Sequence, residues 1–258
     1  MGAIRFTIAG GVLYAALRMM GAQNPNAQEW RGSAIVGLLL PAFGHGTVCY
    51  VQQTVSSSLA ALSIATAPIW MAIFSSIWGH HITRQEWLGI GVGLAGIVLL
   101  NMGGTFNLSN GHVDYASAAL LIFAAASWSF GSVWGKHLTQ PNGLMAAAVQ
   151  MLVGGAALTV WSNLVGETWP AYISVKSWGA MVFLVVLGSL VAYSAYQWLL
   201  KNVRPLVASS NTFVNPIVAF TVGIWLANEK VAMNEYVALA VILVGVFLVL
   251  TAENKESK

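Results

Sequence analysis

Apolar segments long enough to cross a lipid bilayer recur along almost the whole chain, separated by short polar breaks. A bilayer core about 30 Å thick is crossed by a helix of roughly 20 residues. Only 7% of the 258 residues are charged, whereas a soluble protein carries about 25% charged residues. The sequence therefore predicts an all-α integral membrane protein with about nine transmembrane helices, at residues 2–20, 32–53, 58–79, 86–103, 115–136, 143–164, 177–200, 206–228 and 233–252.

The basic residues are shared unequally between the two sides of the predicted bundle. When alternate loops are assigned to opposite sides, one side receives Arg5, Lys176 and Lys230, and the other receives the remaining eight of the 11 basic residues. Short cytoplasmic loops are enriched in Lys and Arg. We therefore expect a multi-pass protein whose C-terminus, with a tail at residues 253–258, is cytoplasmic. Orientation in the membrane explains the net charge of +3, so we predict no nucleic-acid partner.

Two parts of the chain resemble each other in the same order. Matching residues recur at spacings of 145 to 149, as in Arg5 with Gln150, Pro68 with Pro216, and Gly96 with Gly245. The predicted first copy, residues 1–103, has four helices, and the second copy, residues 115–252, has five. A full copy of five helices would place the next copy upside down in the membrane. Such inverted-repeat helical bundles are typical of secondary transporters, whose substrate site lies near the midplane between the copies.

Four motifs are spread over the chain: Arg5-Phe6-x-x-Ala9-Gly10, Glu86-Trp87-x-Gly89-Ile90-x-x-Gly93-Leu94-Ala95-Gly96, Ala126-Ser127-Trp128-Ser129-Phe130-Gly131-Ser132-Val133 and Val214-Asn215-Pro216-Ile217-Val218-Ala219. With these motifs the chain resembles the EamA type of the drug/metabolite transporter superfamily, and is most similar to its YedA-like bacterial inner-membrane exporters. The resemblance implies ten helices in two five-helix repeats, with both termini cytoplasmic. It also implies a location in the inner (plasma) membrane and export of metabolites or drugs, driven by an ion gradient or by exchange.

The start of the chain differs from the pattern that this resemblance implies. Family members have an additional N-terminal helix, which would be the partner of the helix at residues 115–136, and this chain shows none. A misassigned start codon, a fragment and a natural truncation are three open explanations.

His45 and Tyr193 correspond at a spacing of 148, and each has a polar or thiol neighbour four residues later, Cys49 or Gln197. Residues four apart share one face of a helix. The two helices are therefore candidates to present a polar stripe to a substrate cavity. Buried hydrogen bonds between helices, which are common for such residues in membrane bundles, are the equally open alternative.

Asn211 and Asn215 precede Pro216, and Ser63 precedes Pro68 in the matching place. Proline removes one backbone hydrogen bond of a helix and frees a carbonyl group. Asn211 and Asn215 are therefore candidates for the substrate pathway, and the two prolines are hinge candidates. The alternative is that the polar side chains only satisfy the freed backbone.

Arg5 and Gln150 are the next matched pair of pathway candidates. An inward-facing Arg5 would attract an anionic or carboxylate-bearing substrate. Because Arg5 lies only a few residues into its helix, however, we expect its side chain to extend to the membrane interface in the chain as it stands.

Trp128 lies near the middle of its predicted helix, between Ser127 and Ser129. Its indole is a candidate to stack on a drug-like or amino-acid substrate. Packing between helices is the open alternative.

Acidic residues fall in loops or near helix ends, so no carboxylate is expected at the membrane midplane. If transport is coupled to protons, His45 is the titratable candidate at that depth, while facilitated diffusion and exchange stay equally open. Cys49 is the single cysteine. No disulfide, cofactor or metal site is predicted.

The leading hypothesis is a secondary transporter that exports small molecules by alternating access, with the lipid bilayer and a small-molecule substrate as partners and a homodimer as a further possibility. An intramembrane enzyme is the first alternative, although the chain has no G-x-S-x-G or H-E-x-x-H motif, and we predict no catalysis. A membrane partner protein without transport activity is the second alternative.

Overall fold

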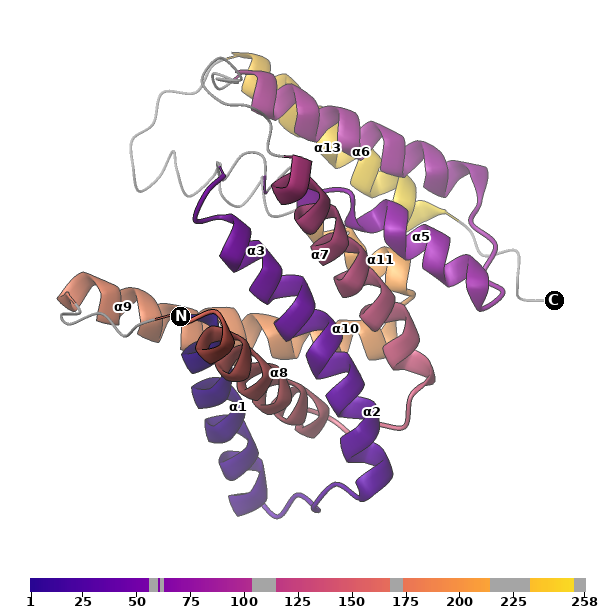
Figure 1. Ribbon diagram of the computed structural model, residues 1–258. Helices are drawn as coiled ribbons and strands as arrows, with labels where there is room; N and C mark the ends of the chain where they lie inside the picture. Colours follow the sequence, from indigo (N-terminus) through magenta and orange to yellow (C-terminus); the bar gives the residue numbers. More distant parts are fainter. Residues whose placement is uncertain (56–59, 61–62, 104–114, 168–173, 214–232, 253–258) are drawn as a thin grey trace. The chain divides into compact units, whose positions relative to one another are not determined.

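The structure is a computed structural model that describes residues 1–55, 60, 63–103, 115–167, 174–213 and 233–252, without the side chains of residues 100–103 and 233–235. Within these ranges every regular element is a helix (Figure 1), which confirms the all-α membrane fold. The elements are α1 (Gly2–Met19), α2 (Ala27–Gly37), η1 (Leu38–Gly46), α3 (Thr47–Val51), α5 (Ala67–Ile77), α6 (Arg84–Gly103), α7 (Tyr115–Trp134), η3 (Gly135–His137), α8 (Met145–Leu164), α9 (Val175–Phe183), η4 (Leu184–Tyr193), α10 (Ser194–Asn202), α11 (Pro205–Ser209) and α13 (Met233–Thr251).

The helices lie where the apolar segments predicted them. Four helices in the described ranges are long and apolar enough to cross a membrane: Ala27–Val51, Tyr115–His137, Met145–Leu164 and Val175–Asn202. Two shorter apolar helices are Ala67–Ile77 and Tyr236–Thr251. Most of the span predicted at 206–228 and the tail at 253–258 lie outside the described residues.

The chain forms two compact units, and neither unit is one half of the sequence. Unit 1 contains residues Met1–Tyr50 and Phe130–Val203, and unit 2 contains Val51–Ser129 and Arg204–Lys258. Each unit thus combines a segment from the first predicted copy with a segment from the second.

In unit 1, α1 packs along α8 in the antiparallel direction (Figure 1). A Cβ atom added to Gly2 would lie 3.4 Å from the side chain of Leu158, and one added to Gly10 would lie 2.7 Å from the backbone nitrogen of Leu152. Residue numbers therefore rise along α1 as they fall along α8. Small residues at this contact let the two backbones approach closely.

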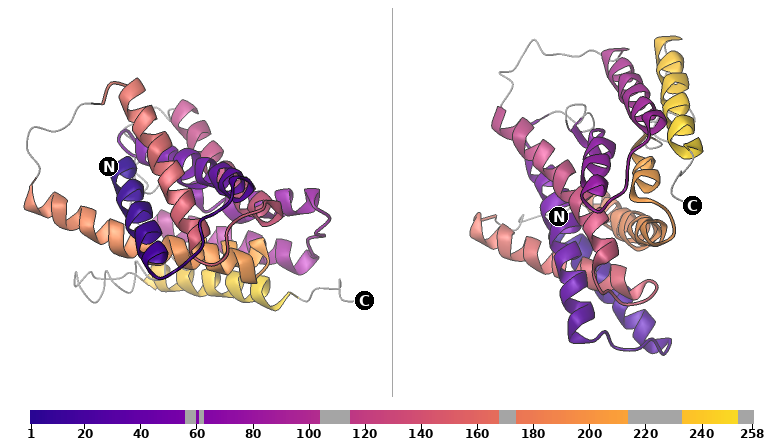
Figure 2. Two further views of the ribbon diagram at one scale, coloured as in Figure 1. Left: turned by 90° about the horizontal axis from the view of Figure 1, so that it is seen from below. Right: turned by 90° about the vertical axis from the view of Figure 1, so that its right-hand side faces the viewer.

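In unit 2, α6 and α13 pack in the same manner, side by side in Figures 1 and 2. A Cβ atom added to Gly89 would lie 2.8 Å from Val249, and one added to Gly96 would lie 2.7 Å from Ile242. The glycines of this face contact the partner helix, as the Gly89-x-x-x-Gly93 spacing predicts.

These two helix pairs are the ones that the internal repeat matches with each other. Arg5 of α1 corresponds to Gln150 of α8, and Gly96 of α6 corresponds to Gly245 of α13. Equivalent helices of inverted copies must run in opposite directions, and both pairs do. The bounds of the copies, residues 1–103 and 115–252, stay a prediction.

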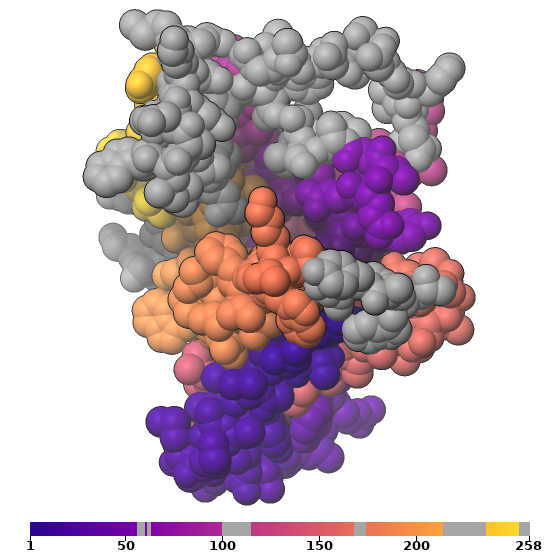
Figure 3. Space-filling view, turned by 90° about the vertical axis from the view of Figure 1, so that its left-hand side faces the viewer, coloured from indigo at the N-terminus to yellow at the C-terminus, as the bar shows by residue number. Residues whose placement is uncertain are grey.

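The outer face of unit 1 is apolar, and its interior contains polar side chains among apolar ones. Large apolar side chains are exposed along α9 and η4, among them Val182, Phe183, Leu187 and Val191. Figure 3 shows these helices in orange against α1 in indigo. Ser189 of η4, by contrast, is fully buried. An apolar exterior of this kind suits lipid rather than water as the surrounding solvent.

Two of the membrane helices of unit 1 are interrupted by π-helical segments. The segment η1 contains Pro41, which has no backbone N–H to donate, whereas η4 contains no proline. The segments begin 146 residues apart, at Leu38 and Leu184, a spacing that fits the repeat. Single π-turns inside α-helices occur frequently at functional sites.

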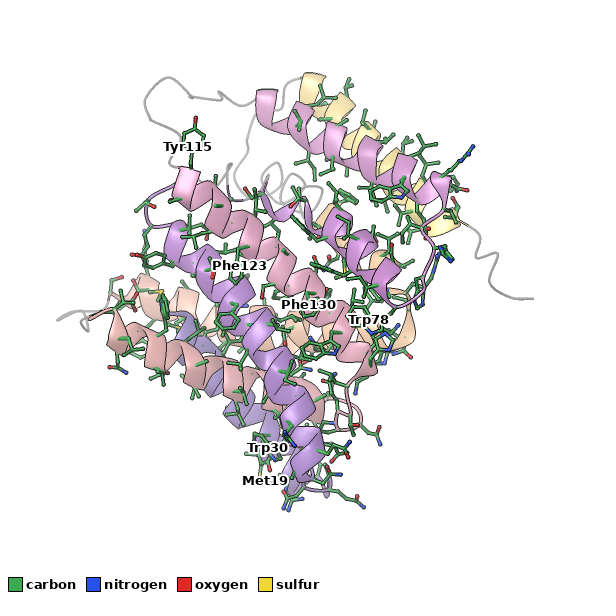
Figure 4. All side chains as sticks on the ribbon, turned by 45° about the vertical axis from the view of Figure 1, so that its right-hand side comes forward. Met19, Trp30, Trp78, Tyr115, Phe123 and Phe130 are labelled. Atoms are coloured by element: carbon green, nitrogen blue, oxygen red, sulfur yellow. The ribbon has the colours of Figure 1, made fainter. Side chains whose placement is uncertain are left out.

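One end of unit 1 is formed by the turn from α1 to α2, where Figure 4 labels Met19 and Trp30 and where the Trp30 ring lies 6.2 Å from the ring of Tyr14. Asn26 caps α2 there, because its side chain accepts from the backbone of Glu29 at 2.9 Å and its backbone donates to the Glu29 carboxylate at 2.8 Å. This capping box satisfies two orphan donors and defines the start of α2.

Candidate functional site

Arg5 and His45 form a polar contact inside unit 1. Arg5 Nη1 lies 3.2 Å from His45 Nε2, and Arg5 Nε donates to Ser189 Oγ at 2.7 Å. His45 Nε2 also lies 3.4 Å from the thiol of Cys49, one turn later. The ring of Phe6 lies beneath the guanidinium at 5.0 Å from Arg5 Cζ and meets the His45 ring edge-on at 5.3 Å.

A second polar contact joins Gln150 of α8 to Tyr193 of η4. The Tyr193 hydroxyl donates to Gln150 Oε1 at 2.8 Å, and Gln150 Nε2 donates to Gln140 Oε1 at 2.5 Å. Gln150 and Tyr193 are both buried. Phe6 lies 6.1 Å from Tyr193, so that the same aromatic ring contacts both polar pairs.

The two pairs occupy corresponding places in the repeat. Arg5 matches Gln150 and His45 matches Tyr193 in the sequence, and the structure pairs Arg5 with His45 and Gln150 with Tyr193. The two matched pairs of the repeat are thus joined in two equivalent contacts, each of which contains one residue from each pair.

The expectation that Arg5 extends to the membrane interface is wrong. Its guanidinium turns into unit 1, where Ser189 supplies an acceptor and Gly188 leaves room for it. A Cβ atom at Gly188 would lie 2.8 Å from Arg5 Nη2. The ring of Phe6 adds a cation–π interaction with the guanidinium. The interior of unit 1 therefore supplies partners for the Arg5 side chain.

Ser189 and Gln140 belong to this site but were not predicted. Ser189 lies four residues before Tyr193, so the spacing rule that linked Tyr193 to Gln197 also points to it. Gln140 lies in the loop between η3 and α8. No local pattern identifies a loop residue of this kind, because only the fold brings it to Gln150.

The other candidates are not members of these two contacts. Gln197 follows Tyr193 on α10 and is buried in unit 1. Trp128 is half-buried on the unit 2 part of α7, and Asn211 is exposed in unit 2. Asn215 and Pro216 lie outside the described residues.

Pro68 stands in the first turn of α5 rather than in a helix interior. A turn at Ala65 and Thr66 separates α5 from the helical residues Ser63 and Ile64. Proline is well tolerated in the first helical turn because the N–H groups there have no partner within the helix. The helix is therefore interrupted just before Pro68, in the place predicted for a hinge.

Arg5 has no carboxylate partner in the described part of the chain, where the one salt bridge joins Arg204 to Glu86 in unit 2. The site in unit 1 is thus a set of neutral hydrogen-bonding groups with one guanidinium charge. Such a set suits binding of a polar or anionic small molecule.

A sequence model of the EamA-like transporter family matches residues 1–102 and 116–251. The chain belongs to the EamA-like transporter family. Like other EamA-like proteins it is a helical, multi-pass membrane transporter, and a small molecule and membrane lipid are its partners.

The chain is similar along most of its length to proteins that are named as transporters. The chain is 40% identical over 250 residues to the uncharacterized inner membrane transporter YedA of Escherichia coli, covering 96% of this chain and 80% of YedA. It is 25% identical to the uncharacterized transporter sll0355 of Synechocystis, covering 94% and 78%. This EamA-like protein is accordingly assigned to the inner membrane.

A solved crystal structure shares the fold, with a TM-score of 0.75 at 19% sequence identity, covering 96% of this chain and 86% of the other. At that identity the likeness concerns the fold alone.

Proposed function

We propose that this EamA-like protein is a secondary transporter that exports small metabolites or drug-like molecules across the inner membrane by alternating access. The two equivalent polar contacts inside unit 1 carry the proposal. Polar groups at membrane depth are costly and mark substrate or ion pathways. A transporter built from inverted copies opens alternately to the two sides of the membrane around a site between the copies. The two contacts occupy equivalent places in the two copies.

The substrate pathway in this proposal follows the line of polar side chains through unit 1. Gln140, Gln150 and Tyr193 are joined by hydrogen bonds. Phe6 then separates Tyr193 from His45, at ring distances of 6.1 Å and 5.3 Å. A polar or amino-acid-like substrate would exchange hydrogen bonds along this line, and the aromatic ring of Phe6 would contact its apolar part.

The π-helical segments and the break before Pro68 support a moving scaffold. η1 carries His45 near its end, and η4 ends with Tyr193. A π-helical turn allows the register of a helix to shift locally, and a break in a helix allows its backbone angles to change. His45 is the titratable group for proton coupling in this scheme.

The test is efflux from cells that produce His45→Ala, Gln150→Ala or, in unit 2, Asn211→Ala. Metabolites in the medium and in the cells are compared with those of the unchanged chain at equal membrane abundance. Loss of a hydrogen bond to a polar or charged substrate group should lower efflux of the affected compound about tenfold.

Asn163→Ala is the matched control, because Asn163 is an exposed residue of α8 whose side chain donates to the Thr159 carbonyl of the same helix. Its efflux should equal that of the unchanged chain. Unchanged efflux in both His45→Ala and Gln150→Ala would reject the pathway through unit 1.

A further inference from the structure

A cavity of about 170 Å³ lies in unit 1, between the end of α7 and the end of α10. Polar or basic side chains make up half of its lining, namely Ser132, Lys136, Gln140, Gln197 and Lys201. At about 30 Å³ for each water molecule, the space suits a group the size of a carboxylate or a phosphate.

Two lysine residues, Lys136 and Lys201, line this cavity. Lys136 Nζ donates to the Val203 carbonyl at 2.8 Å, and Lys201 Nζ donates to the Pro141 carbonyl at 2.8 Å. Each ammonium has three donors, so the two carbonyls leave donors available on both. The residues that line the cavity include no Asp or Glu. The positive charge is therefore held at the cavity and not neutralised by its lining.

Gln197 adds a buried donor that has no acceptor. Its side chain is 6% exposed, and Nε2 has no hydrogen-bond partner among the described residues. The nearby Tyr193 hydroxyl interacts with the Gln197 side chain and donates its own proton to Gln150, but it does not meet hydrogen-bond geometry with Gln197 Nε2. A buried amide N–H that makes no bond is costly, and an acceptor in the cavity would satisfy it.

Membrane orientation alone does not explain this arrangement. The enrichment of Lys and Arg in cytoplasmic loops requires only that the charges lie on one side. It does not require two lysines at one cavity, each oriented by a backbone carbonyl, beside an unsatisfied amide. These three features together are those of a binding site for a negatively charged oxygen group.

We propose that this cavity is an anion-binding site that takes a carboxylate or phosphate group. Lys136 and Lys201 supply the charge, and Gln197 Nε2 donates a hydrogen bond. Gln140 lines the cavity and accepts from Gln150, so the site adjoins the polar line through unit 1. That an anionic substrate binds first at this site rests on the proposed function, whereas anion binding itself does not.

The test measures equilibrium binding by the whole chain in phosphatidylcholine nanodiscs. Sodium benzoate and sodium phosphate are titrated at constant ionic strength, and the melting temperature is followed by tryptophan fluorescence. The unchanged chain should show a saturable rise in melting temperature with at least one anion. Lys136→Gln and Lys201→Gln should each weaken the apparent affinity about tenfold, and Gln197→Leu should weaken it as well.

Two control variants separate binding from folding. Lys136→Arg keeps the charge and should retain binding. Arg31→Gln removes a basic residue of α2 that does not line the cavity, and its affinity should be unchanged. If the unchanged chain responds neither to the soluble anions nor to an anionic lipid, or if Arg31→Gln weakens binding as much as the lysine variants, the proposal is overturned.

Nanodiscs that contain phosphatidylglycerol distinguish the two sources of the anionic group. A lysine-dependent stabilisation by phosphatidylglycerol alone, with no response to benzoate or phosphate, identifies a lipid headgroup as the ligand. A response to the soluble anions in phosphatidylcholine identifies a soluble ligand. Both results support the site, and lack of a lysine-dependent response to any of these anions rejects it. Because no transport is measured, a failure of the export proposal is recognised separately.

Discussion

Glu86 is a fully buried acid, at 1% exposure, near the start of α6 in unit 2. Its carboxylate accepts from Arg204 Nη1 at 2.6 Å and from the backbone and hydroxyl of Thr83 at 2.8 Å and 3.0 Å. Arg204 also donates to the carbonyl of Ala252 at 3.1 Å. A buried charge is tolerated only when it is paired and hydrogen-bonded in this way. The contact holds the start of α6 near the residue that follows α13.

Glu86→Gln should lower the free energy of unfolding by about 2 kcal/mol, because Arg204 then loses its counter-charge while it stays partly buried. Equilibrium unfolding in mixed detergent micelles measures the change. Glu167→Gln is the control, since Glu167 is exposed, and should change stability by less than about 0.5 kcal/mol. In the double variant Glu86→Gln with Arg204→Met the losses should not add; additive losses would show that the pair is not coupled.

Sequence reasoning at the residue scale found the site partners but not their contacts. The repeat spacing identified Arg5, His45, Gln150 and Tyr193, because equivalent positions of two copies share an environment. It did not predict the direction of the Arg5 side chain, because a long cationic side chain near a helix end can extend to the membrane interface or into the bundle. Its inward direction depends on other helices, which supply the space at Gly188, the Ser189 hydroxyl and the His45 ring.

At the scale of elements, glycine positions determine how closely the helices approach. A Cβ atom at Gly245 of α13 would lie 2.5 Å from the backbone nitrogen of Gly93. At Gly91, on the same helix as Gly93, an added Cβ meets nothing within 4 Å. Glycines two residues apart on α6 thus have different roles, because side chains two residues apart point in different directions.

Gly245→Ala should separate α6 from α13 and lower the free energy of unfolding by about 2 kcal/mol, as overpacking against backbone does. Gly91→Ala should leave stability unchanged or raise it by about 0.5 kcal/mol, because alanine favours the helix. Thermal unfolding in detergent, followed by tryptophan fluorescence, compares the two. Equal effects of both substitutions would contradict the packing described for this helix pair.

At the scale of the whole molecule, the segments are combined across the two halves of the sequence. Each unit takes one segment from each predicted copy, and in each unit the matched helices run antiparallel, as the glycine contacts show. This exchange makes each unit depend on both copies. It follows that neither copy should fold into one of these units by itself.

The expected membrane orientation has a direct test in unit 1. Asn142 and Glu167 are exposed residues in the loops at the two ends of α8. In a Cys49→Ser background, Glu167→Cys should react with a membrane-impermeant maleimide in intact cells, and Asn142→Cys should react only after lysis. A fluorescent protein fused to the C-terminus should report from the cytoplasm. Labelling of Asn142→Cys in intact cells would reverse the orientation.

The membrane class, the positions of the helices and the inverted relation of the copies could all be inferred from the sequence. These features depend on local apolar length, because a backbone in lipid must satisfy its hydrogen bonds within each helix, and on spacing between related residues. The inward turn of Arg5, the partners Ser189 and Gln140, and the lysine cavity were decided only by the tertiary structure. Each depends on contacts between residues far apart in the chain, where the space left by one helix determines which side chain of another can enter.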